Sequence, residues 1–85
     1  RTRVVRDQYE ALATVRDELK LAQSLIRRVS DKARRTELTN AYDQAQTSVM
    51  RAVNAGHRFV YDDLRDELAT AQKRAEALLA RLATR

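Results

Sequence analysis

The amino-acid sequence predicts an all-α protein built as an antiparallel, up-down-up three-helix bundle with coiled-coil-like heptad packing. Apolar residues recur at alternating spacings of three and four, which gives each helix one apolar stripe that needs helical partners. The 85 residues include one Gly and no Pro, so helix interiors are left unbroken. No stretch alternates apolar with polar residues, as a half-buried strand would. We expect one domain over residues 1–85, within a longer protein because the sequence begins with Arg, with helices at about 3–30, 37–54 and 61–83.

The first expected helix has an apolar stripe with one polar interruption at Gln8. Leu21 falls outside the stripe and is expected to be exposed. Three further residues, Val4, Tyr9 and Leu25, widen the stripe as a bundle helix requires. The stripe itself consists of Val5, Leu12, Val15, Leu19, Ala22, Ile26, Val29 and Ala33.

The first break must be located from the phase of the pattern, because residues 30–40 contain neither Gly nor Pro. The step of five from Ala33 to Leu38 fits neither three nor four. Ser30 and Asp31 are residues that start helices better than they continue them. We therefore predict a turn within residues 31–37. The alternative is a long helical hairpin, in which one helix continues to about residue 54.

The second break is predicted at Asn54-Ala55-Gly56, where Gly56 would take the left-handed conformation that ends a helix. Residues 57–60 would connect to the third helix, with Phe59 and Val60 packed against the end of the bundle. The second helix should bury a face of small residues. Uninterrupted stripes are expected in the last two helices, at Leu38, Ala41, Tyr42, Ala45, Val49 and Ala52, and at Tyr61, Leu64, Leu68, Ala71, Ala75, Leu78 and Leu82.

The net charge of +5 is expected to be unevenly distributed. In an up-down-up bundle, the end of the first helix, the start of the second and the end of the third share one pole. Basic residues near helix C-termini are also favoured by the helix dipole, at about 0.3–1 kcal/mol each. We favour that structural explanation over a dedicated anion site. The candidate docking residues, called the basic pole below, are Arg27, Arg28, Lys32, Arg34, Arg35, Lys73, Arg74 and Arg81.

The sequence has no recognisable catalytic or metal-binding pattern. There is no Cys, and His57 is the only His, so thiolate and paired-imidazole metal sites have no ligands. A single Gly cannot build a Gly-rich phosphate loop. Asp62, Asp63 and Asp66 form an acidic first turn without the spaced oxygens of a calcium loop. We expect no enzyme activity, no cofactor, no small-molecule substrate and no transmembrane segment.

These observations predict a non-catalytic helical-bundle module that acts as a structural spacer or protein–protein interaction unit. Regular heptads can also pair between chains, so self-association is open. The alternative is a binder of nucleic acid or another anionic polymer through the basic pole. That alternative is weaker, because the basic segments lack the aromatic residues on which bases stack.

Overall fold

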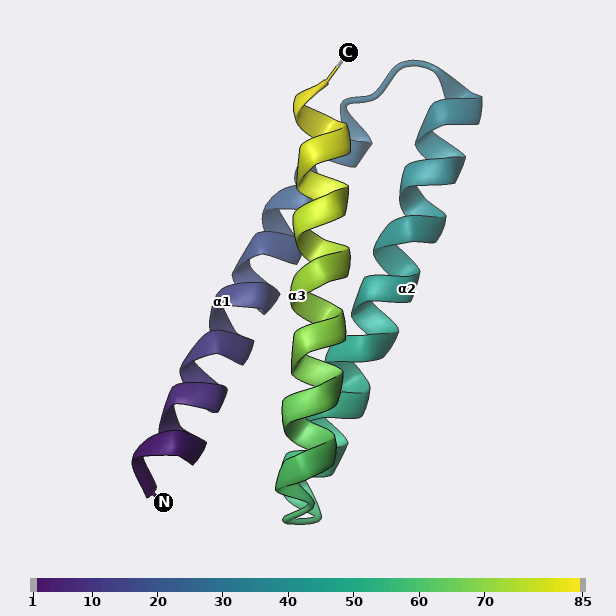
Figure 1. Cartoon of the computed structure of the whole chain (residues 1–85). Helices are drawn as coiled ribbons and strands as arrows, with labels where there is room; N and C mark the ends of the chain where they lie inside the picture. The colour runs from purple at the N-terminus through teal and green to yellow at the C-terminus, as the bar shows by residue number, and fades with distance from the viewer. Residues whose placement is uncertain (1, 85) are drawn as a thin grey trace.

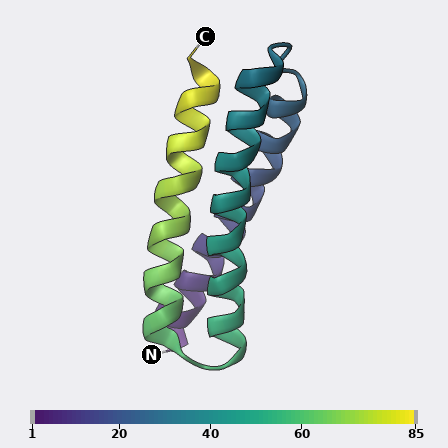
Figure 2. The same ribbon diagram turned by 90° about the vertical axis from the view of Figure 1, so that its right-hand side faces the viewer.

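The computed structural model describes residues 2–84, and it contains three α-helices within that range: α1 (Thr2–Arg27), α2 (Lys32–His57) and α3 (Tyr61–Ala83). They pack side by side into a rod of 46 × 17 × 15 Å. The α1–α2 connection lies at the end where α3 finishes, and the α2–α3 connection lies at the opposite end (Figure 1). Viewed from the side, α2 and α3 run alongside each other while α1 crosses behind them at an angle (Figure 2).

The first connection spans residues 28–31, earlier than the predicted turn at 31–37, and α2 begins at Lys32 rather than about 37. Asp31 is the N-cap residue, and its Oδ1 accepts a hydrogen bond from the Ala33 N–H at 3.1 Å. This cap satisfies one of the free N–H groups at the start of α2. The interruption makes the long-hairpin alternative wrong. Ala33 belongs to α2 and is exposed, which explains the phase step.

The end of α2 differs from the prediction at Gly56, which is helical and has no positive φ. The left-handed residue is Phe59, with φ 60°. The Phe59 N–H donates to the Gly56 carbonyl at 3.1 Å, and the Val60 N–H donates to the Ala55 carbonyl at 2.9 Å. These two bonds are the Schellman arrangement, in which Gly usually occupies the left-handed position. Here a Phe occupies it, three residues beyond the chain's only Gly.

Gly56 serves close packing instead. It is buried, and a Cβ built on it would lie 2.5 Å from Tyr9 Oη and 3.1 Å from two carbons of the same ring. The ring of Tyr9 therefore occupies the space that a larger residue at position 56 would need. This contact joins the start of α1 to the end of α2.

The predicted stripes form most of the core of the bundle. The prediction is wrong at Tyr61, at the start of the third stripe, and at Val4 and Tyr9, which were expected to widen the first stripe, because all three are exposed. α2 and α3 share more neighbouring residues than either shares with α1, because small side chains allow two helices to approach closely. Four alanines of α2 and α3 have no exposed surface: Ala45, Ala52, Ala71 and Ala75. Buried larger side chains are Leu12, Val15, Leu19 and Ile26 of α1, Leu38 and Val49 of α2, and Leu64, Leu68 and Leu78 of α3. Leu21 is exposed, as predicted.

One polar side chain, Ser48, is buried in the part of the core that the structure describes. Its Oγ accepts a hydrogen bond of 2.8 Å from Arg74 Nη1, which also donates to the Gln44 carbonyl at 3.2 Å. A buried hydroxyl without a partner would cost about 1–3 kcal/mol. Arg74 therefore ties the middle of α3 to the middle of α2.

Replacing Phe59 with Gly should stabilise the fold. A bulky residue in the left-handed region costs on the order of 1–3 kcal/mol, and the Phe59 side chain is 75% exposed, so it contributes little burial in return. We expect Phe59→Gly to raise the free energy of unfolding in urea by about 1 kcal/mol. Phe59→Ala keeps the β-carbon and should change it by less than about 0.5 kcal/mol. Equal effects of the two substitutions would contradict the strain at this position.

Candidate functional site

The structure divides the predicted basic pole into groups with different surroundings. Lys73 and Arg74 lie nine or ten residues before the end of α3 at Ala83, which is roughly 15 Å along the helix axis. Arg74 is bound to Ser48 and Gln44 of α2. These two residues are therefore outside the end surface on which the sequence pattern placed them.

Arg34 holds the C-terminus of α3. Its Nη2 donates to the carbonyl oxygens of Arg81, at 2.8 Å, and Thr84, at 2.9 Å. The last carbonyl groups of a helix have no partners within the helix and carry its partial negative charge. The Arg34 guanidinium supplies hydrogen-bond donors to these carbonyl groups and a positive charge near the negative end of the helix dipole. Arg34 of α2 therefore caps the C-terminus of α3.

Arg35 performs a similar task for the first connection. Its Nη1 donates to the Val29 carbonyl at 2.8 Å, and both Arg34 and Arg35 are half-buried. Arg81 is more exposed and forms an ion pair of 3.6 Å with Glu37 across the α2–α3 contact. Exposed pairs of this kind contribute about 0–1 kcal/mol.

Three members of the basic pole are left with exposed side chains around the first connection: Arg27, Arg28 and Lys32. None of these three side chains forms a hydrogen bond or ion pair with another residue in the range described. The part of the basic pole that is available to an outside anion is therefore much smaller than the sequence pattern indicated.

The opposite end of the rod is apolar, a feature that the sequence did not predict. Among the described residues, six of the seven large hydrophobic side chains that are exposed lie in the half containing the α2–α3 connection; the seventh is Leu21. Phe59 and Val60 do not pack under the bundle as expected, because they are 75% and 37% exposed. We call the following residues the apolar end: Val4, Tyr9, Phe59, Val60 and Tyr61.

The Schellman turn fixes the form of the apolar end. Phe59 lies edge-on to Tyr61, with ring centroids 6.4 Å apart and planes at 73°, an arrangement that aromatic pairs favour. Tyr9 reaches the same end from α1 through its contact with Gly56. Exposed aromatic side chains of α1, of the turn and of α3 therefore lie toward the same end of the rod.

Acidic residues flank the apolar end at the start of α3. Arg65 pairs with Asp62 at 3.7 Å and with Asp66 at 3.1 Å. Within residues 2–84, no group of three or more His, Cys, Asp or Glu side chains is arranged to hold a metal ion. The acidic turn also lies where the dipole of α3 favours negative charge.

Comparisons with protein families, curated proteins and solved structures find no match to this chain. Of the helices described, none is long and apolar enough to cross a membrane.

The capping role of Arg34 can be separated from its charge. Arg34→Gln removes the two hydrogen bonds to the end of α3 and should lower the free energy of unfolding by about 1 kcal/mol. Arg28→Gln makes the same change in net charge at an exposed, uncommitted side chain and should change stability by less than about 0.5 kcal/mol. Chemical denaturation of the two variants at matched salt measures the difference, and equal losses would contradict the capping role.

Proposed function

We propose that the protein is a non-catalytic docking module that binds a protein partner through its apolar end. The observation that carries this proposal is that several exposed apolar side chains lie toward one end of the rod, while most of the apolar stripe residues of the three helices are buried or half-buried. Scattered exposed apolar residues are ordinary, but a contiguous group marks an interaction surface.

Phe59 gives the proposal its sharpest support. Its left-handed backbone lowers stability compared with a Gly at the same position, and its exposed ring buries little surface to offset that strain. Strained backbone in folded proteins is concentrated at functional sites. Aromatic side chains are also the usual anchors of protein interfaces. A docking role would explain why a residue that strains the backbone occupies this turn.

The shape of the rod constrains the partner. The backbone spans 17 × 15 Å across the rod. Even with the side chains added, the end face is on the order of a few hundred Å², below the roughly 800 Å² per partner of a stable interface. Two flat ends meeting would therefore associate weakly. A partner with a concave apolar pocket that receives Phe59 and surrounds the end of the rod buries more surface. We therefore favour a different protein as the partner over a second copy of this chain.

Binding of an anionic polymer is supported less well. Around the first connection, Arg27, Arg28 and Lys32 are the members of the basic pole whose exposed side chains have no partner among the described residues, and Lys73 is exposed farther along α3. Proteins that bind duplex DNA commonly make about 6–10 phosphate contacts. Salt-sensitive DNA binding that disappears when the three charges around the first connection are reversed would favour this alternative. Reversal at Arg34 or Arg35 would disturb the helix ends as well.

Photo-crosslinking tests the docking proposal. A p-benzoylphenylalanine introduced for Phe59 should yield one dominant adduct in a lysate of the source organism, either with a single partner protein or with a second copy. The same photoreactive residue introduced for Leu21, which is 54% exposed at the other half of the rod, is the matched control. Anchors such as aromatic residues lie within interfaces, so the two positions should differ.

Competition with unlabelled protein tests whether the crosslink at position 59 depends on the Phe59 side chain. Excess wild-type protein should suppress the adduct at position 59, whereas excess Phe59→Gly protein should not, although that variant is expected to be the more stable one. Equal adducts at positions 59 and 21, no adduct at 59, or equal competition by the two proteins would overturn the proposal.

A further inference from the structure

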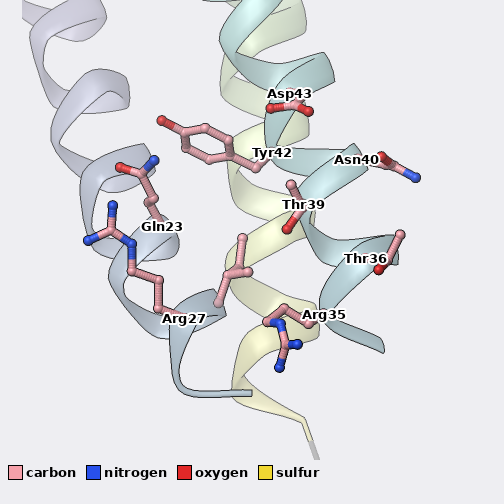
Figure 3. Close-up of a pocket in the computed structure, with 9 residues that line it drawn as sticks. Gln23, Arg27, Arg35, Thr36, Thr39, Asn40, Tyr42 and Asp43 are labelled. Atoms are coloured by element: carbon pink, nitrogen blue, oxygen red, sulfur yellow. The ribbon is translucent and has the colours of Figure 1, made fainter. Parts of the chain in front are cut away.

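A cavity of about 340 Å³ opens between α1 and α2, close to the first connection. This volume lies within the range of small-ligand sites in proteins. Figure 3 shows side chains from both helices around it, with the Tyr42 ring reaching from α2 toward Gln23 of α1. The lining also includes Ile26, Arg27, Arg35 and Thr39.

The lining combines an apolar base with uncommitted hydrogen-bond donors. Ile26 is 5% exposed and belongs to the core, and the Tyr42 ring is half-buried against it. The side chains of Gln23, Arg27 and Tyr42 donate to no acceptor among the described residues. Such a combination of apolar wall and a few polar groups is typical of sites for small molecules.

Two arginines set the electrostatic character of the cavity. Arg35 is held in place by its hydrogen bond of 2.8 Å to the Val29 carbonyl, which leaves its other N–H groups available. Arg27 extends from the α1 side with a free guanidinium (Figure 3). Asp43 lines the cavity too, so its charged side chains sum to one positive charge.

We propose that this cavity binds a small organic carboxylate with one negative charge and a compact apolar or aromatic body. The body lies against Ile26 and the Tyr42 ring, and the carboxylate accepts hydrogen bonds from Arg27 on the α1 side, where Gln23 also lies and toward which the Tyr42 hydroxyl points (Figure 3). Guanidinium groups match the geometry of a carboxylate. Asp43 disfavours ligands of higher negative charge by repulsion. The site uses none of the residues of the apolar end.

Phenylacetate is a suitable probe, and phenylacetamide is its neutral counterpart of nearly equal shape. A ligand of this size, open to solvent, should bind with a Kd in the millimolar range, since small ligands gain only about 0.3 kcal/mol or somewhat more per heavy atom. Titration of the ¹⁵N-labelled protein with phenylacetate at low salt should give saturable shifts of amide signals at residues 23–27 and 35–43. Phenylacetamide should bind at least about fivefold more weakly.

Two neighbouring arginines provide the decisive pair of variants. Arg27→Gln should weaken phenylacetate binding about fivefold or more, whereas Arg28→Gln, which makes the same change in net charge outside the cavity, should weaken it less than about twofold. Equal affinity for phenylacetate and phenylacetamide would overturn the carboxylate preference. Equal effects of the two variants, shifts centred elsewhere, or no saturation by about 20 mM would overturn the site.

Discussion

The close contact between α2 and α3 is the constraint on which the rest of the structure depends. Ala45 and Ala52 of α2 face a core that also buries Ala71 and Ala75 of α3, and none of the four exposes any surface. Because each alanine buries little area, this contact is narrow and needs a third helix to enclose it. α1 packs on it through Leu12, Val15, Leu19 and Ile26, and it crosses the pair at an angle (Figure 2).

This arrangement leaves function to the ends of the rod and to the opening between α1 and α2. The buried hydroxyl of Ser48 is satisfied by Arg74, whereas the buried Gln8 Oε1 of α1 has no hydrogen-bond partner among the described residues. At one end, Arg34 binds the C-terminus of α3 and Arg35 binds the Val29 carbonyl of the first connection. These two positive charges therefore stabilise the fold. At the other end, the turn at Phe59 exposes apolar surface that a Gly would have avoided. Charge at the first end thus stabilises the fold, whereas the strained backbone at the other end does not.

Periodicity predicted most of the fold: the helical class, the buried stripes, the exposed Leu21 and the bounds of α3 at 61–83. Periodicity failed to locate the ends of α1 and α2, because the spacing of apolar residues identifies the buried face of a helix but not the residues at which the helix begins and ends. Gly56 was the expected cap. Instead, the Tyr9 ring lies where a side chain at position 56 would be, and the left-handed residue is Phe59. Long arginine side chains were the second difficulty, since their partners lie on other helices. Counting about 1.5 Å per residue would have moved Lys73 and Arg74 away from the basic pole.

Native-state hydrogen exchange tests the central role of the α2–α3 contact most directly. Amides in the middle of α2 and α3, around Ala45–Ala52 and Ala71–Ala75, should exchange only through global unfolding. Amides in the middle of α1, around residues 15–22, should exchange through an opening that costs at least about 1 kcal/mol less. Protection in α1 equal to or greater than that in α2 and α3 would contradict the claim that the α2–α3 pair is the base on which α1 packs.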